Sequence, residues 1–289
     1  MTDAPAVSIV IRCRNEAPHL GPVLDAVRAQ AGAPPAEILA LDSGSTDGTL
    51  DVLAHHAVRV EHIPADDFTF GRALNLGARL ARGALLVHLS AHCRPLGTDW
   101  LARLVAPFAD PAVVAAFGRQ VPIPGVNPIE AIAMTRNFPA AGPARVLFSN
   151  ANGAVRRAAV LARPWDEEIP AAEDHLWAAD VRAPERVAYV PEAAVAHSHP
   201  MTLGEWRFRF YVNGVAAEYA RAHGVALPWA GDALAGVVAG RAGRLLRLAG
   251  VLARRGEMAA LARLPAYAWA RTVDYARGVR DGARRYGRR

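Results

Sequence analysis

The sequence has only two cysteines, no lysine and no long uninterrupted apolar run. Cys13 and Cys93 are too few for a disulfide framework or a four-cysteine zinc site, and so little cysteine is typical of a reducing compartment. Arginines interrupt the most apolar part of the C-terminal region, so we expect no helix that spans a bilayer. Residues 1–6 carry an acid and no basic flank, which argues against a signal peptide.

The net charge of +6 is unevenly distributed along the 289 residues. Residues 228–289 hold 13 arginines against 4 acidic residues, whereas residues 1–227 are slightly acidic. Aromatic residues are few, at 7%, and no nucleic-acid-binding motif is present, so we expect no nucleic-acid partner. The change in composition predicts two domains, one over residues 1–227 and a basic helical extension over residues 228–289.

Short β-branched runs alternate with helical patterns over about the first 90 residues. This alternation predicts a right-handed βαβ succession, with a parallel sheet covered by helices on both faces and a ligand site beyond the carboxyl ends of the strands. The predicted strands lie at 7–12, 37–41, 58–62, 84–89, 113–117 and 187–190. The predicted helices lie at 19–30, 49–56, 70–82, 100–108, 173–181 and 203–221. Residues 122–143 are rich in proline and glycine and predict a loop-rich insertion.

The segment LDSGSTDGT, residues 41–49, follows the second predicted strand. It places Asp42 at the strand tip, a glycine for a tight turn, and then hydroxyls and an acid that can cap the next helix. A carboxylate at this position can accept hydrogen bonds from a base N–H or from ribose hydroxyls. The alternative is an ordinary helix cap in a βα loop.

Together with this segment, several other motifs resemble the inverting glycosyltransferases of family 2 in order and spacing. They are VSIVI (7–11), RNE (14–16), ALNLG (73–77), ARG (81–83), FSNAN (148–152), AED (172–174) and VAHSH (195–199). The resemblance spans about residues 7–224, and FTFGR (68–72) with the Asn75 segment is most similar to the rhamnosyltransferase-like branch. It implies an α/β fold of the GT-A type: a Rossmann-like, nucleotide-sugar-binding, mixed and mostly parallel sheet flanked by helices, followed here by a C-terminal helical extension.

The resemblance also implies roles for individual residues. The residues implied in nucleotide-sugar binding are Arg14, Glu16, Asp42, Ser43, Ser45, Arg72 and Asn75, and those implied in acceptor binding are Asn150 and Asn152. A guanidinium suits an anionic diphosphate because its donors are bidentate. For Arg72 the alternative is a solvated charge at a helix start, and for the asparagines it is a loop or cap role.

Asp174, with Glu173 as its neighbour, matches the catalytic base of the family. Displacement at an anomeric carbon needs a base that takes the proton of the acceptor hydroxyl, and a carboxylate can do this. The alternative is a capping pair at the start of a helix.

The sequence departs from the family at the end of the fourth predicted strand, where Ser90-Ala91-His92 replaces the usual Asp-x-Asp-like pair that holds a divalent cation. Mg²⁺ prefers oxygen ligands, whereas imidazole suits softer metals better. Three alternatives follow. His92 with His197 or His199 binds a divalent cation such as Mn²⁺ or Mg²⁺; arginine and histidine charges neutralise the diphosphate without a metal; or the transfer site is degenerate.

These residues predict an inverting glycosyltransferase of cell-surface polysaccharide or glycolipid synthesis. It would transfer a sugar from a UDP-, GDP- or dTDP-linked donor to a hydroxyl of a glycan or lipid-linked acceptor. The alternative is a nucleotide-sugar-binding or scaffold protein without catalysis. Leu245, Leu248 and Leu252 recur at helical spacing beside arginines, a pattern typical of a helix on an anionic membrane, here the inner face of the plasma membrane, in a cytoplasmic protein. Helices that pack on the catalytic domain are the alternative.

Overall fold

The computed structural model describes residues 5–197, 201–225, 227 and 234–287. The chain forms two compact units. The first comprises Met1–Ile123, Thr135–Glu168 and Glu173–Ser198, and the second comprises Pro124–Met134, Ile169–Ala172 and His199–Arg289. The predicted boundary between residues 227 and 228 falls beside residues outside the described part of the chain, and it stays a prediction.

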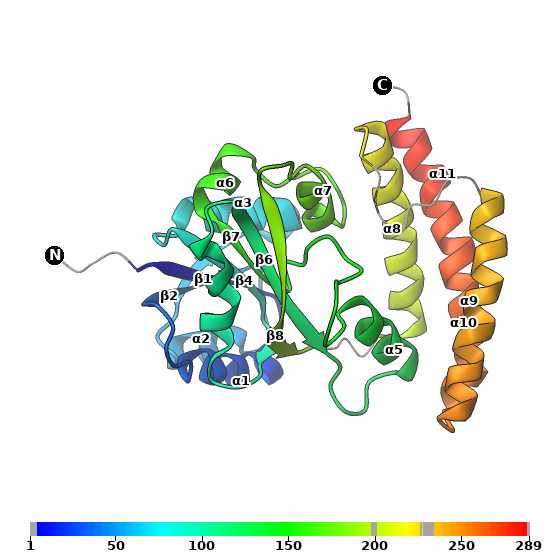
Figure 1. Cartoon of the computed structure of the whole chain (residues 1–289), viewed down its shortest axis with the longest axis horizontal. Coiled ribbons are helices and arrows are strands. Elements are labelled where there is room, and N and C mark those ends of the chain that lie inside the picture. Colours follow the sequence, from blue (N-terminus) through cyan, green and yellow to red (C-terminus); the bar gives the residue numbers. More distant parts are fainter. Residues whose placement is uncertain (1–4, 198–200, 226, 228–233, 288–289) are drawn as a thin grey trace. The chain divides into compact units, whose positions relative to one another are not determined.

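The first unit is built on a mixed sheet of eight strands in the order β3-β2-β1-β4-β7-β6-β8-β5 (Figure 1). Parallel pairing joins β3, β2, β1 and β4, and it also joins β6 to β8, while β7 runs antiparallel between β4 and β6. The strands are β1 Val7–Cys13, β2 Ala36–Asp42, β3 Arg59–His62, β4 Leu85–Ser90, β5 Arg94–Pro95, β6 Val113–Val121, β7 Asn152–Arg156 and β8 Arg186–Ala196. The mixed, mostly parallel sheet that the sequence predicts is confirmed.

Helices cover both faces of this sheet, as the nearly continuous apolar run of β1 requires. Ile9 and Ile11 pack into a core with α1, α2 and α4, whereas Val10 faces the core under α3 on the other side (Figure 1). The helices of this unit are α1 Ala17–Arg28, α2 Thr49–His55, α3 Phe70–Leu80, α4 Trp100–Val105, α6 Arg157–Ala162 and α7 Glu173–Ala179, with short 3₁₀ turns η1 Ala65–Asp67 and η2 Ala106–Ala109.

The prediction of a loop-rich insertion at 122–143 is wrong in its middle, where α5 spans Pro128–Asn137. Proline starts this helix, and the Asn127 side chain accepts a hydrogen bond from the N–H of Ile129 at 2.9 Å. Prolines and glycines flank the helix on both sides, so the average composition of the segment hid it. Both β6 and β8 also extend further than the predicted strands at 113–117 and 187–190.

The second unit contains the C-terminal helices α8 Leu203–Ala222, α9 Leu234–Arg254, α10 Met258–Trp269 and α11 Tyr275–Tyr286, with a π-helical turn η3 at Ala270–Asp274 (Figure 1). Trp206, Leu252, Leu264 and Tyr267 form its core. Buried Asp274 accepts hydrogen bonds from Arg207 at 2.9 Å and 3.4 Å and so ties α8 to the end of η3. None of the described helices is long and apolar enough to cross a membrane.

Candidate active site

One edge of the sheet collects most of the residues to which the sequence analysis gave chemical roles. This edge is formed by the carboxyl ends of five strands, β1, β2, β4, β6 and β8. The amino end of β7 lies at the same edge, because β7 is antiparallel to its neighbours. Asp42 ends β2, His92 follows β4, and His197 follows β8. Ligand sites of open α/β sheets lie beyond the carboxyl ends of the strands, so this edge is the candidate active site.

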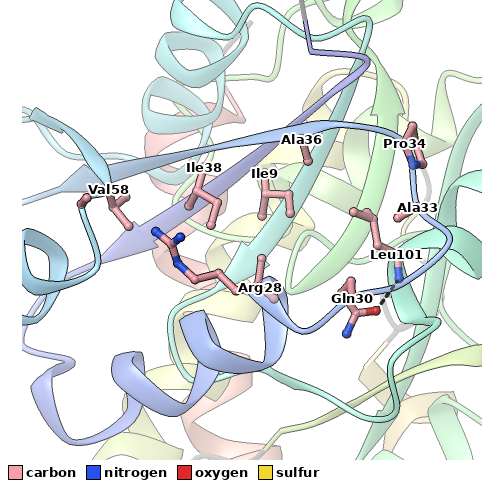
Figure 2. A pocket seen from close by; sticks show the side chains of 11 residues that line it. Ile9, Arg28, Gln30, Ala33, Pro34, Ala36, Ile38, Val58 and Leu101 are labelled. Carbon is pink, nitrogen blue, oxygen red and sulfur yellow. Dashed lines mark hydrogen bonds between the residues drawn. The ribbon is translucent and has the colours of Figure 1, made fainter.

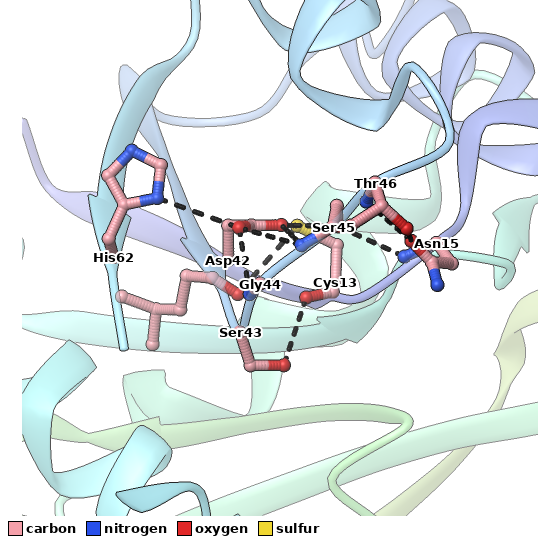
Figure 3. A network of polar contacts seen from close by, with 9 residues as sticks. Cys13, Asn15, Asp42, Ser43, Gly44, Ser45, Thr46 and His62 are labelled. Atoms are coloured by element: carbon pink, nitrogen blue, oxygen red, sulfur yellow. Dashed lines mark hydrogen bonds and ion pairs between the residues drawn. The ribbon is translucent and has the colours of Figure 1, made fainter. Parts of the chain in front are cut away.

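The Asp42 loop is held by the carboxylate at its start (Figure 3). Asp42 is 1% exposed and accepts hydrogen bonds from the backbone N–H of Gly44 at 3.0 Å, from the N–H of Ser45 and from the Ser45 hydroxyl. His62 lies 3.5 Å from the same carboxylate. Burial opposes ionisation, but the hydrogen bonds from Ser45 and Gly44 outweigh it and lower the pKa of Asp42. Asp42 is therefore a carboxylate at neutral pH.

The same loop is fastened to the end of β1. Asn15 has a φ of 56°, a left-handed conformation that asparagine tolerates. Its side-chain oxygen accepts from the N–H of Thr46 at 2.7 Å, and its own N–H donates to the Ser45 hydroxyl at 3.0 Å (Figure 3). Ser43 is buried and donates through both its N–H and its hydroxyl to the carbonyl of Cys13. The loop is therefore preorganised, and a base N–H would compete with the Ser45 hydroxyl for Asp42.

Glu173 and Asp174 begin α7 side by side, and both are largely removed from water. Burial raises the pKa of both groups, and the charge of Asp174 raises that of Glu173 further. Asp174 accepts hydrogen bonds from the N–H of Asn150 at 3.3 Å and from the N–H of His175 at 2.8 Å. These two donors hold the carboxylate in one orientation and favour its charged form.

Asn150 connects this acid pair to the sheet. Its side-chain N–H donates to Glu173 at 3.3 Å, and its side-chain oxygen lies 2.8 Å from Nδ1 of His88. Burial lowers the pKa of His88 to about 3, so this histidine is neutral and carries its proton on Nδ1, facing the asparagine oxygen. The Asn150 amide is therefore fixed in orientation by groups on both sides.

Arg12, on β1, supplies the positive charge beside the acid pair. Its guanidinium lies 3.8 Å from Glu173, donates to the carbonyl of Asn150 at 3.5 Å, and lies 5.3 Å from the centre of the Phe70 ring. Burial lowers the pKa of Arg12, while Glu173 and Asp174 raise it. An arginine keeps its proton in such a site, so one buried cation faces two carboxyl groups.

His92 and His197 stack at the same edge, with ring centroids 5.2 Å apart. Nδ1 of His92 lies 2.8 Å from the Glu16 carboxylate, and Nδ1 of His197 lies 2.7 Å from the side-chain oxygen of Gln120. Both partners present an oxygen acceptor, so each imidazole donates its Nδ1 proton to that oxygen. Ser149 accepts from Gln120 at 2.8 Å and so fixes the amide of that residue.

This histidine pair fits a transition metal better than Mg²⁺. Ligand atoms of His92, Cys93 and His197 lie within 4.8 Å of one another. Imidazoles whose second nitrogen is oriented by an oxygen acceptor are the usual form of metal-binding histidine, and two nitrogens and a sulfur are soft donors. His199, the third histidine of the predicted metal set, lies outside the described residues.

The remaining predicted residues occupy different surroundings. Arg14 is exposed at the tip of β1. Arg72 donates to the carboxylate of Glu167 at 3.3 Å and to the carbonyl of Asp67 at 2.8 Å. Asn75 is buried and exchanges hydrogen bonds with the backbone of Trp165, each at 2.9 Å. In this arrangement Asn75 holds the loop that contains Trp165, and its contact with a diphosphate stays a prediction.

Asn152 also lies in the interior, with no exposed surface. It accepts from the Trp100 indole at 2.9 Å and donates to the carbonyl of Ala193 at 2.9 Å and to that of Arg119 at 3.3 Å. These contacts use both of its donor hydrogens, and they tie β7 to β6 and β8. The side chain therefore stabilises the sheet beneath the site, and its predicted contact with an acceptor remains a prediction.

Two cavities lie in the first unit. One, of about 250 Å³, borders the Asp42 loop and is lined by His62, Ile63, Pro64, Asp67, Arg72, Leu76 and Arg79. The other, of about 300 Å³, lies between α1 and the amino ends of β1 and β2 (Figure 2). Its lining residues are apolar in type except for Arg28 and Gln30, and Gln30 accepts from the N–H of Leu101 at 3.1 Å. Only the first cavity adjoins the residues with predicted chemical roles.

Sequence reasoning missed three residues of the site: Arg12, His88 and Gln120. Arg12 and His88 lie inside strands, where an apolar run made them look like part of the core pattern. Gln120 lies beyond the predicted end of its strand. Alternation along β4 and β6 is the signal that could have found His88 and Gln120, because a polar side chain on an inward position needs a partner.

Comparison with known proteins identifies the family. The sequence model of glycosyl transferase family 2 matches residues 8–169. The chain belongs to this family. It is 29% identical over 225 residues to the O-antigen chain rhamnosyltransferase RfbN of Salmonella typhimurium, covering 72% of this chain and 71% of that protein. It is 28% identical over 196 residues to the O-antigen chain rhamnosyltransferase WbaN of Salmonella anatum, covering 63% of this chain and 62% of that protein. The predicted resemblance to the rhamnosyltransferase-like branch is confirmed.

Solved structures confirm the GT-A fold of this glycosyltransferase. The mannosyltransferase PcManGT from Pyrobaculum calidifontis, in complex with GDP-Man and Mn²⁺, matches with a TM-score of 0.59 at 20% identity, over 93% of this chain and 88% of that one. Glucosyl-3-phosphoglycerate synthase from Mycobacterium tuberculosis, in complex with Mn²⁺, UDP and phosphoglyceric acid, matches with a TM-score of 0.54 at 18% identity, over 75% and 76%.

Proposed function

We propose that this family 2 glycosyltransferase is an inverting rhamnosyltransferase that acts in O-antigen-like polysaccharide synthesis. The observation that carries the proposal is the acid pair of buried Glu173 and half-buried Asp174, at the same sheet edge as the preorganised Asp42 loop. The names of the two Salmonella relatives support rhamnose as the sugar and a growing glycan as the acceptor.

In the proposed reaction Asp174 is the general base. The acceptor hydroxyl attacks the anomeric carbon while the bond to the nucleoside diphosphate breaks on the opposite face, and the hydroxyl proton passes to the Asp174 carboxylate. The N–H groups of Asn150 and His175 hold this carboxylate in place before the reaction. Its raised pKa makes it a stronger base than an exposed aspartate.

Donor recognition is proposed at the Asp42 loop and the cavity beside it. Asp42 and Ser45 present acceptor and donor groups for the nucleoside of a UDP-, GDP- or dTDP-linked sugar. Arg72, in the cavity wall, and Arg14, at the tip of β1, offer guanidinium donors to the diphosphate. The solved neighbours bind GDP-Man and UDP, so the fold accepts more than one nucleotide.

A divalent cation is proposed at His92, Cys93 and His197. A metal held by these residues would supply positive charge to the departing diphosphate. Mn²⁺ accompanies the nucleotide in both solved neighbours described above, but this chain offers no carboxylate at the corresponding strand end, where it has Ser90-Ala91-His92. The imidazole and thiol donors of this chain therefore favour a metal softer than Mg²⁺ or Mn²⁺. Arg12 contributes charge there whether or not a metal binds.

The test is transfer by the purified protein with dTDP-rhamnose and with the UDP- and GDP-linked sugars, each with and without Mn²⁺. We expect Asp174→Asn to lose about 10²- to 10⁴-fold in kcat, the usual contribution of a general base, and to retain nucleotide binding by calorimetry. Asp180→Asn, at the exposed end of α7, is the matched control. An α-linked product from an α-linked donor contradicts inversion.

Loss of the metal carboxylate also favours a second candidate, a nucleotide-sugar-binding protein without catalysis. Nucleotide binding by a wild-type protein that shows neither transfer nor slow donor hydrolysis with any metal supports this candidate. We also propose that the protein acts at the inner face of the plasma membrane, on a glycan or lipid-linked acceptor, and the O-antigen names of the two relatives support this.

A further inference from the structure

The stripe of leucines that the sequence singled out for membrane contact is not the exposed face of the C-terminal helices. Leu252 is fully buried, and Leu245 and Leu248 pack against the same core with Trp206 and Tyr267. The amphipathic pattern in α9 therefore stabilises the second unit. This part of the membrane hypothesis is wrong about which residues would face the lipid.

A different apolar stripe is exposed on α10. Met258, Ala262, Pro265 and Trp269 are all exposed, and Met258 and Trp269 are 63% and 59% accessible. Their spacing of four, three and four residues places them on one side of the helix. The opposite side carries Ala260, Leu264 and Tyr267, which are buried in the core of the unit. Helix α10 is thus apolar on the side that packs and also on the side that faces solvent.

The chain around this stripe is strongly basic. Residues 241–271 hold seven arginines and a single acidic residue, Glu257. Arg254 and Arg255, in the turn that leads into α10, are exposed, as is Arg263 on the helix itself. An exposed tryptophan and methionine with arginines beside them match the composition of interfacial helices, whose apolar side enters the lipid while their cations meet anionic headgroups.

We propose that the exposed face of α10, formed by Met258, Ala262, Pro265 and Trp269, docks on an anionic lipid surface. A second copy of the chain fits this face less well. A dimer formed through the stripe would bring the arginines of both copies close together, and their like charges would repel. Anionic headgroups neutralise the same arginines, and the acyl region receives the apolar side chains. The surface is separate from the transfer site, so the inference does not depend on the proposed function.

The experiment is sedimentation of the full chain with vesicles of phosphatidylcholine alone and of equal parts phosphatidylcholine and phosphatidylglycerol. We expect binding to the anionic vesicles only, weakened by salt. The double variant Met258→Gln with Trp269→Gln should bind at least tenfold more weakly. Leu161→Gln, which changes an exposed leucine on α6 in the same way, should bind as the wild type does.

Two further variants distinguish insertion of Trp269 into the lipid from attraction of the arginines to the headgroups. Trp269→Phe should keep the binding but lose most of the blue shift of tryptophan emission on vesicle addition, because Trp100, Trp165, Trp177 and Trp206 are already buried. Trp229, the sixth tryptophan, lies outside the described residues, so both proteins are compared in a Trp229→Phe background. Replacing Arg254 and Arg255 by glutamine should weaken binding about fivefold per charge, as expected for arginines near an anionic surface.

Three results overturn the proposal. The first is a wild-type protein that does not bind anionic vesicles at low salt. The second is a Met258→Gln, Trp269→Gln variant that binds as the wild type does while its circular dichroism is unchanged. The third is a concentration-dependent dimer, seen by analytical ultracentrifugation, that the same variant abolishes while vesicle binding is absent, which would assign the face to a second copy.

Discussion

Asn150 joins the polar groups of the acid centre. Its backbone N–H donates to Asp174, its side chain donates to Glu173, and its carbonyl accepts from Arg12. Ser149, the preceding residue, accepts from the glutamine that orients His197. Two consecutive residues therefore link the proposed base to the histidine pair. The sequence predicted Asn150 as an acceptor ligand, but it gave no sign of these links, because they depend on residues far apart in the chain.

The mutual effect of the two carboxyl groups predicts a change in the pH dependence of transfer. A carboxylate base is active when deprotonated, so the raised pKa of Asp174 predicts that the rate falls at a higher pH than it would with an ordinary aspartate as the base. In Glu173→Gln one carboxyl group is gone, and Asp174 should ionise more readily. We expect the acid limb of kcat/KM against pH to move to lower pH. Glu185→Gln, away from the acid pair, is the control, and an unmoved acid limb contradicts the coupling.

At the scale of elements, apolar periodicity predicted most helices and strands of the first unit to within a few residues. It succeeded where one face of an element is buried along its whole length, as in β1 and α1. It failed for α5, which flanking prolines and glycines obscured, and for the later part of β6. The continuation of β6 depends on pairing with β8, a contact between residues distant in sequence.

Close approach of β6 and β8 predicts that Gly118 cannot be replaced. A Cβ at Gly118 would lie 1.8 Å from the carbonyl oxygen of Ala193 and 2.5 Å from the side-chain nitrogen of Asn152. We expect Gly118→Ala to lower the free energy of unfolding by at least about 2 kcal/mol, since overpacking of this kind shifts backbone. Gly21→Ala, inside α1 with only an ordinary contact at 3.9 Å, should instead add about 0.5–1 kcal/mol. Urea denaturation measures both; equal effects would contradict the packing argument.

At the scale of the whole molecule, the basic charge divides between two units with different surroundings. The C-terminal unit carries most of the excess arginine, while most of the family's motifs lie in the first unit. Family, fold class and the position of the site at the sheet edge were predictable from motifs and alternation. The discontinuous second unit was not, because short segments around residues 124–134 and 169–172 join it through tertiary contacts.

Nucleotide binding should stabilise the folded protein through the Asp42 loop. At a nucleotide concentration 100 times its Kd, binding adds about 2.7 kcal/mol to the free energy of unfolding. We therefore expect a rise in Tm with the cognate nucleotide among UDP, GDP and dTDP. Asp42→Asn should lose most of this rise, because an amide cannot accept from Gly44 and Ser45 as the ionised carboxylate does. Asp51→Asn on α2 is the matched control. An undiminished rise in Asp42→Asn contradicts the role of the loop.

The continuous sheet of the first unit has a consequence for how the enzyme distinguishes its substrates. Asp42 and His197 are attached to the same sheet, on β2 and directly after β8, with β1, β4, β7 and β6 between them. Neighbouring hydrogen-bonded strands are spaced about 4.8 Å apart, so the sheet holds these two positions at a constant distance from each other. A hinge within this sheet cannot change it. In the proposed site, a longer or shorter donor must therefore be accommodated by changes in the loops and side chains at the carboxyl ends of the strands.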